Sequence, residues 1–188
     1  MIKWFKIVMI GTLVFLGACQ SNEVAEEPYE GIPLKIAVVG ETPEVREEQI
    51  IFKTLSLEEL YRSHPDKYDA VFIREEHFSD ASHQKYVEMF KKKRAPSFFI
   101  ASKANTIPFQ DLENPVSYKE KEAAKKINDT QNYISGFLYE GADEGYQGWK
   151  FSYPVKNNEI QRDNVQGIYS SVFKLVEKEL NKASSING

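Results

Sequence analysis

Cysteine is almost absent from this chain, because Cys19 is the only one among 188 residues. An intrachain disulfide, a zinc cluster held by several thiolates and dithiol redox chemistry all need more than one cysteine, so all three are excluded. Histidine is scarce as well. The three histidines, His64, His77 and His83, show neither the HExxH spacing of a zinc protease nor a recognisable triad arrangement.

The short motifs of phosphate binding and ester hydrolysis are also missing. The sequence contains no GxSxG segment, no GxGxxG segment, and neither GxxxxGKS nor GxxxxGKT. A phosphoacceptor domain needs an aspartate at the end of its third strand, where this sequence has Ile73 and Arg74. Nucleotide binding and nucleophilic catalysis are therefore disfavoured, and no cofactor is expected.

Basic charge is in deficit, since 24 Lys and Arg residues face 28 Asp and Glu residues for a net charge of −4. Removing residues 1–18 takes away two lysines and no acidic residue, which leaves about −6. Such a surface repels phosphate backbones, so we expect no nucleic-acid partner. The basic run Lys91-Lys92-Lys93-Arg94 lies at the end of an expected helix, where it complements the helix dipole. Binding of nucleic acid or anionic lipid is the alternative for that run.

The first eighteen residues follow the pattern of a secretory signal. Met1–Lys6 carries two lysines and no acidic residue, and Ile7–Ala18 is a run of apolar or small residues broken only by Thr12. As a helix, this run would cover about 18 Å, against roughly 30 Å of bilayer hydrocarbon. It is therefore too short for a comfortable permanent span.

The end of this segment, Leu16-Gly17-Ala18-Cys19, resembles the lipobox of bacterial lipoproteins. The resemblance covers only the first nineteen residues. It implies cleavage before Cys19, a diacylglyceryl group on the Cys19 thiol and an anchor at the extracytoplasmic face of a membrane, where two or three acyl chains hold stably. An ordinary signal peptide with an incidental cysteine, or an uncleaved anchor, is the alternative. Gln20 is not the aspartate of an inner-membrane retention signal, which leaves the envelope type open.

Three parts follow from this pattern: a signal peptide over 1–18, a lipidated cysteine with a flexible acidic tether over 19–31, and one α/β domain over 32–188. The tether contains four glutamates, a proline and a glycine, and hardly any large apolar residue. With 41% hydrophobic and 13% aromatic residues, the chain has enough apolar material for a real core.

The first half of the domain alternates expected strands and helices. The apolar run over 34–39 ends at Gly40 and predicts a strand buried on both faces. Further strands are expected over 50–55, 69–73 and 96–101. The helices expected between them cover 43–49, 56 to Pro65, and Ser79 or Asp80 to Arg94. This order predicts a mostly parallel sheet with right-handed crossovers.

The second half has a different pattern. We expect a polar helix over 117–128, and an antiparallel hairpin of strands 134–139 and 149–155 across the glycine-rich segment 140–148. An amphipathic helix over 165–181 then packs on the sheet. The predicted fold class is α/β, a three-layer domain whose mostly parallel sheet has helices on both faces and an antiparallel hairpin at one edge.

Ligands of open parallel sheets bind outside the carboxyl ends of the strands. The residues that follow the first, third and fourth expected strands are therefore the candidate ligand-binding residues: Glu41, Thr42, Arg74, Glu75, His77, Ser102 and Lys103. Arg74 and Lys103 would form an anion clamp. The alternative is a set of solvated loop residues with internal salt bridges.

Two other groups of residues carry side chains of the kind that bind ligands. Carboxylates and imidazoles gather over 75–83 and suit zinc or manganese, but His77 and His83 are six residues apart and would lie on different helical faces, so no metal site is expected. The acidic, aromatic segment 140–148 could bind calcium or sugars, but a mobile hairpin tip is the preferred interpretation.

These observations favour a non-catalytic, membrane-anchored lipoprotein that binds a small molecule or an envelope protein. A hydrolase or transferase that uses Glu41, Glu75, Glu76 or His77 as acid or base is one alternative. A structural or assembly lipoprotein, for which location is the only requirement, is another.

Overall fold

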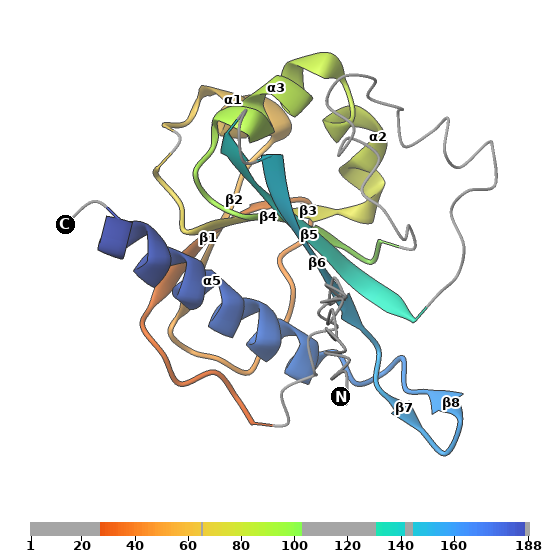
Figure 1. Ribbon diagram of the computed structural model, residues 1–188. Coiled ribbons are helices and arrows are strands. Elements are labelled where there is room, and N and C mark those ends of the chain that lie inside the picture. The colour runs from red at the N-terminus through yellow and green to blue at the C-terminus, as the bar shows by residue number, and fades with distance from the viewer. Residues whose placement is uncertain (1–26, 65, 103–130, 142–144, 187–188) are drawn as a thin grey trace, which may run out of the picture.

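A six-stranded sheet forms the centre of the molecule (Figure 1). The computed structural model describes residues 27–64, 66–102, 131–141 and 145–186. The strands are β1 (Leu34–Val39), β2 (Ile50–Thr54), β3 (Ala70–Arg74), β4 (Ser97–Ile100), β5 (Asn132–Gly141) and β6 (Gly145–Ser152). Their order is β2-β1-β3-β4-β5-β6, and β1 to β4 are parallel, whereas β5 is antiparallel to both β4 and β6. The prediction of a mostly parallel sheet with an antiparallel hairpin at one edge is confirmed.

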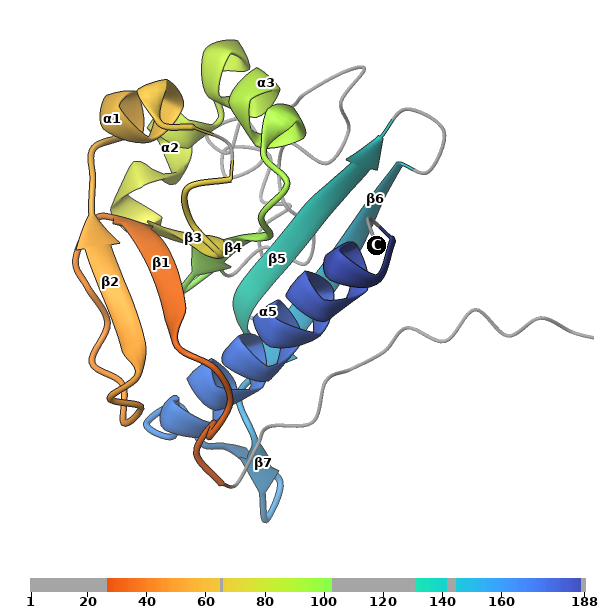
Figure 2. The same cartoon turned by 90° about the vertical axis from the view of Figure 1, so that its left-hand side faces the viewer.

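Helices cover both faces of this sheet, as Figure 2 shows from the side. One face carries α1 (Leu57–Arg62), the 3-10 helix η1 (Glu75–His77), α2 (Phe78–Ala81) and α3 (Gln84–Lys92). The other face carries α5 (Gln166–Ile186), which runs in roughly the same direction as β5 and β6 in Figures 1 and 2. The three-layer arrangement is therefore confirmed, and each face of the sheet contributes to a separate hydrophobic cluster.

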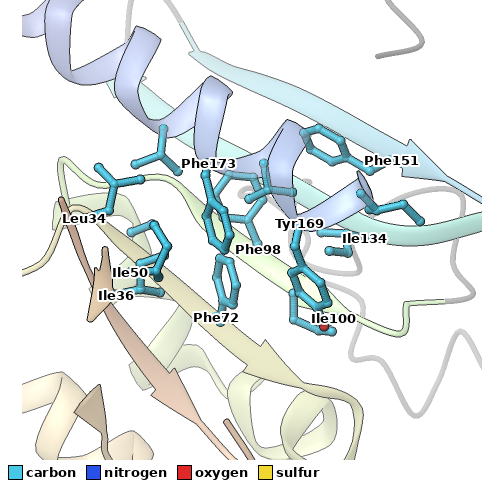
Figure 3. Packing of buried hydrophobic residues seen from close by; sticks show 14 of the residues in the cluster. Leu34, Ile36, Ile50, Phe72, Phe98, Ile100, Ile134, Phe151, Tyr169 and Phe173 are labelled. Atoms are coloured by element: carbon cyan, nitrogen blue, oxygen red, sulfur yellow. The ribbon is translucent and has the colours of Figure 1, made fainter. Parts of the chain in front are cut away.

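The core under α5 is rich in aromatic side chains (Figure 3). Phe72 of β3 lies at its centre, with its ring centroid 6.3 Å from Phe173 of α5 and 5.7 Å from Phe98 of β4. Strand β1 sends Leu34, Ile36 and Val38 into this cluster and Ala37 and Val39 into the opposite one. That division explains why the run over 34–39 is apolar at successive positions.

Helix α1 begins as the sequence predicts. Ser56 is the N-cap: its hydroxyl accepts a hydrogen bond from the Glu59 backbone N–H at 3.2 Å, and the Ser56 N–H donates to Glu59 Oε2 at 2.8 Å. This capping box satisfies two backbone N–H groups that a helix otherwise leaves unpaired.

The helix predicted over 43–49 is wrong, because that segment contains only a bend, a turn and irregular backbone. Strands β1 and β2 are parallel neighbours, so the connection must return along the whole length of a strand, about 20 Å. Seven residues in a helix would advance only about 10 Å. A helix that starts at Thr42 and Pro43 would therefore be too short to connect the end of β1 to the start of β2.

The single helix predicted from Ser79 or Asp80 to Arg94 is also wrong, since the structure divides it into α2 and α3. At the break, the Ser82 hydroxyl donates to the Ser79 carbonyl at 2.7 Å. Side-chain bonds of this kind compete with the helical pattern. His83 then has extended backbone and serves as the N-cap residue of α3, so the helix direction changes between the two.

The flexible tether expected over 19–31 does not extend to residue 31. The Tyr29 side chain is 2% exposed, and its ring lies 6.0 Å from that of Phe173. Its backbone N–H donates to Glu47 Oε1 at 3.0 Å, and its carbonyl accepts from Gln49 Nε2 at 2.7 Å. The packed domain therefore begins before residue 32, with Tyr29 as a core residue.

The second half departs from the prediction mainly in extent. Strand β6 begins at Gly145, inside the segment expected as a loop, and α5 continues to Ile186. A small hairpin of β7 (Val155–Lys156) and β8 (Glu159–Ile160) precedes α5 and turns at Asn157 and Asn158, both with positive φ. The helix expected over 117–128, the signal segment, Cys19 and Lys103 lie outside the described residues.

Candidate functional site

The carboxyl edge of the sheet contains a point where the chain leaves neighbouring strands toward opposite faces. After β1, the chain runs on the α5 face, where Gln166 Nε2 donates to the Glu44 carbonyl at 3.2 Å. After β3, it enters η1 and α2 on the other face, where Phe78 joins the opposite cluster. Ligands of open α/β sheets bind at such switch points.

Gly40 allows the side chains of β3 to approach β1 at this point. Its φ is +106°, and a Cβ atom there would lie 2.7 Å from Arg74 Cβ and 2.6 Å from Glu76 Oε1. A larger residue would therefore be strained and would displace Arg74. The position of the Arg74 side chain therefore depends on a glycine at residue 40.

Arg74 reaches from the end of β3 toward the start of α5. Its side chain hydrogen-bonds the hydroxyl of Tyr169, which lies 3.0 Å from the hydroxyl of Tyr133 on β5. Burial of the ring is the main cause that raises the pKa of Tyr169, so this phenol stays neutral. An arginine can only donate. Tyr169 therefore accepts from Arg74, and either hydroxyl can donate in the bond between Tyr169 and Tyr133.

The line of side chains continues beyond Tyr133. The Tyr133 ring lies 4.9 Å from that of Tyr153, which follows β6, and the guanidinium of Arg162 lies 5.2 Å over the Tyr153 ring. Such contacts between an arginine and an aromatic face are attractive. We call Tyr133, Tyr153 and Tyr169 the tyrosine cluster; an arginine, Arg74 or Arg162, lies at each end of it.

Arg74 has unused hydrogen-bonding capacity. It is partly buried, and its Nε is fully buried without a hydrogen-bond partner in the part of the chain that the structure describes. An unpaired buried donor of this kind costs about 1–3 kcal/mol. A carboxylate or phosphate oxygen is the acceptor that a guanidinium binds best.

Ser102 and Asn132 fix the position of Tyr133. The Ser102 N–H donates to the Tyr133 carbonyl at 3.0 Å, and Asn132 Nδ2 donates to the Ser102 carbonyl at 2.7 Å and to Ser135 Oγ at 2.9 Å. Ala101 turns the chain here with a φ of +63°. Ser102 is itself buried, so its visible role is to join the end of β4 to the start of β5.

Most of the remaining predicted ligand residues lie at exposed positions. Glu41, Thr42 and Glu75 are exposed, and the Thr42 hydroxyl lies 3.1 Å from that of Thr54, at the end of β2. His77 is half-buried at the end of η1. Because Lys103 lies outside the described residues, the anion clamp of Arg74 and Lys103 stays a prediction.

Sequence reasoning found Arg74 but missed the tyrosine cluster. Its members come from β5, from the segment after β6, and from α5, so no local pattern joins them. A weaker signal was present, because a tyrosine on an apolar helix face needs a partner for its hydroxyl when it is buried. Tyr169 sits on the apolar face of α5 beside Val172 and Phe173.

Metal and membrane features were also sought in residues 27–64, 66–102, 131–141 and 145–186. No group of three or more His, Cys, Asp or Glu side chains lies close enough there to hold a metal ion. No helix in those ranges is both long enough and apolar enough to cross a bilayer.

Comparisons with known proteins were made at three levels, against protein-family models, curated proteins and solved structures. None of the three found a match for this chain.

Proposed function

We propose that this chain is a membrane-anchored extracytoplasmic lipoprotein whose α/β domain binds a small molecule with a carboxylate or phosphate group, without catalysing a reaction. One observation carries the binding part of the proposal. The Arg74 guanidinium lies at the switch point of the sheet, bonded to Tyr169, with a buried Nε that lacks an acceptor among the described residues.

The chemistry of the neighbours supports an anionic ligand with a flat or apolar portion. A guanidinium binds carboxylate or phosphate in a two-point contact, and tyrosine rings contact the flat part of a ligand. Helix α5 begins at this same edge with no acidic residue in its first turn. The positive end of its dipole adds to the attraction.

The proposed anchor is consistent with the start of the packed domain. Cys19 lies ten residues before Tyr29, and ten extended residues span at most about 35 Å. A lipid on Cys19 would therefore hold the domain, and its ligand site, close to the bilayer surface. The support for this part is the lipobox resemblance.

The enzymatic alternative lacks an observation in its favour. Acid-base catalysis requires carboxylates that converge around a substrate in a site of restricted solvent access. Glu41, Glu75 and Glu76 are exposed instead. The structural-lipoprotein alternative predicts that no small anion binds, which the following experiment decides.

The binding proposal is tested by calorimetric titration of the full chain in detergent with citrate, glycerol 3-phosphate and uncharged glycerol. We expect at least one of the two anions to bind, and glycerol not to bind. Arg74→Gln should abolish the binding of citrate and weaken that of glycerol 3-phosphate, and Arg74→Lys should weaken citrate binding about ten-fold because the two-point contact is lost. Arg94→Gln, at an exposed arginine that follows α3, is the matched control.

If neither anion binds the wild-type chain, or if Arg74→Gln binds as the wild type does, the ligand part of the proposal is wrong. The anchor is tested separately by mass spectrometry of the membrane fraction. We expect a chain that starts at an acylated Cys19, and Cys19→Ala should release the protein from the membrane. An intact Met1 terminus or a free thiol at Cys19 contradicts the anchor.

A further inference from the structure

A cavity of about 500 Å³ lies between α1 and α3, on the face of the sheet opposite α5. Its volume falls within the range of small-molecule sites, roughly 300–1,000 Å³. Seven residues line it: Tyr61, Ser63, Lys85, Glu88, Met89, Lys92 and Lys93. We call this the lysine cavity. Arg74 and the tyrosine cluster are not part of it.

Positive charge dominates the wall of the lysine cavity, since three lysines face one glutamate. Glu88 is already engaged, because Lys91 Nζ and Gln84 Nε2 both donate to its Oε1 at 3.1 Å. Lys85 forms an ion pair with Glu58. Among the described residues, Lys92 and Lys93 have no carboxylate within ion-pair distance.

Lys93 is unusual because it is only 3% exposed. Its Nζ donates to Ser63 Oγ at 3.2 Å, whereas an ammonium group has three hydrogens to donate. Burial is the main cause that lowers the pKa of Lys93, and Asp66 acts in the opposite direction. Buried ammonium groups in proteins are normally paired with an anion, because an isolated buried charge is costly.

The lysines of the run 91–93 therefore make different contacts. Lys91 turns back to Glu88 on its own helix, and Lys93 turns inward to Ser63, the residue that follows α1. The sequence interpretation assigned the whole run to the helix dipole. Only the structure shows that Lys93 faces a cavity together with Lys92 and Lys85.

We propose that the lysine cavity binds a phosphate-bearing anion, with its oxygens between Lys92 and Lys93. Lysine is a common phosphate ligand, and the Ser63 hydroxyl lies within reach of the same ammonium group. Tyr61 and Met89 supply the apolar part of the wall. A soluble phosphate ester and the headgroup of an anionic lipid share this chemistry. The inference does not depend on the Arg74 site.

The first test measures thermal unfolding of the full chain in detergent, with inorganic phosphate or with sodium chloride at equal ionic strength. We expect phosphate to raise the Tm in a saturable way, beyond the effect of chloride. Lys93→Met should fold, because it replaces a buried charge with an apolar side chain of similar length. It should weaken phosphate binding by about ten-fold or more, and Lys92→Gln should weaken it less.

Two controls separate this site from others. Lys178→Gln removes an exposed lysine from α5, on the other side of the sheet, and should leave the phosphate effect unchanged. Arg74→Gln should retain a saturable phosphate effect that Lys93→Met weakens, which distinguishes failure here from failure of the proposed function. Absence of a saturable phosphate effect, or a full effect in both Lys93→Met and Lys92→Gln, would overturn the proposal.

The second test identifies the source of the phosphate. The full chain is reconstituted in vesicles of phosphatidylcholine alone or with phosphatidylglycerol, and acylation of Lys92 by an amine reagent is followed by mass spectrometry. Protection by phosphatidylglycerol indicates a lipid headgroup, whereas protection only by added inorganic phosphate indicates a soluble ester. Lack of protection under both conditions would overturn the proposal.

Discussion

The two faces of the sheet are covered by helices of different length. The face with the single long helix has more of the largest buried side chains, and the face with short helices has the lysine cavity. One helix of 21 residues covers the first face, whereas three helices of six, four and nine residues cover the second. Of the eleven largest fully buried side chains, seven belong to the α5 cluster. The lysine cavity lies on the face that carries the short helices.

One buried charged residue on each face, Glu47 and Lys93, can be compared by its hydrogen-bond partners. On the α5 face, Glu47 accepts hydrogen bonds from the Tyr29 backbone and from the Ser170 hydroxyl, and Arg46 Nε lies 3.6 Å from its Oε1. On the other face, Lys93 has one hydroxyl partner. Glu47 Oε1 thus has partners within the protein, although Glu47 Oε2 and Arg74 Nε are buried without a partner among the described residues; on the other face, Lys93 has capacity for a ligand.

The largest expected effect concerns the core under α5. Phe72→Ala removes a ring that contacts Phe98, Tyr169 and Phe173, and should lower the free energy of unfolding by about 3–5 kcal/mol. Leu57→Ala, in α1 on the opposite face, should cost about 2 kcal/mol because that layer is less completely closed. Urea denaturation of both variants measures the difference. Equal losses would remove the distinction between the two faces.

The second effect concerns Glu47. Glu47→Ala leaves the Tyr29 N–H and the Arg46 guanidinium without this acceptor, and should cost about 3 kcal/mol. Glu48→Ala, at the exposed neighbouring position, is the matched control and should be close to neutral. Urea denaturation gives the stabilities. Proteolysis near Tyr29 should also become faster in Glu47→Ala, since that residue holds the N-terminal segment; similar behaviour of both variants would contradict this role.

The main features of the fold could be predicted because they depend on local patterns. The apolar run over 34–39 and the capping box at Ser56 each determine their element from a few adjacent residues. The helix expected over 43–49 failed for a non-local reason, the length of the return to β2. Tyr29 was assigned to a tether because its partners, Glu47 and Phe173, are distant in sequence.

The candidate site was less accessible to prediction than the fold. The switch-point rule selected Arg74 from strand order alone. It could not select Tyr133, Tyr153 or Tyr169, because the pairing of β5 with β6 and the packing of α5 on the sheet bring them together. Lys93 stands in a run of four basic residues, and nothing in the run shows which one turns inward.

A smaller effect tests the hydrogen bonds of the tyrosine cluster. Tyr169→Phe removes the hydroxyl that joins Arg74 to Tyr133, and should cost about 1 kcal/mol of stability while weakening any anion held by Arg74. Tyr146→Phe, at an exposed tyrosine of β6, should change neither quantity. Thermal unfolding and the citrate or glycerol 3-phosphate titration measure the two effects. Unchanged stability would show that the hydroxyl is not part of the polar connection.

The smallest effect concerns the cap of α1, beside the lysine cavity, and depends on pH. The hydrogen bond from the Ser56 backbone N–H, and to a smaller extent the one from the Ser56 hydroxyl, lowers the pKa of Glu59 from its ordinary value of 4.5. A depressed carboxylate pKa stabilises the folded state above the unfolded value, and this contribution is lost as the pH falls through the folded value. Ser56→Ala removes the N-cap hydroxyl and should cost about 1 kcal/mol at neutral pH. That cost should shrink as the pH falls below about 4.5, in urea denaturation at a series of pH values. A cost that is constant across this range would mean that Glu59 does not contribute to the cap as an ionised group.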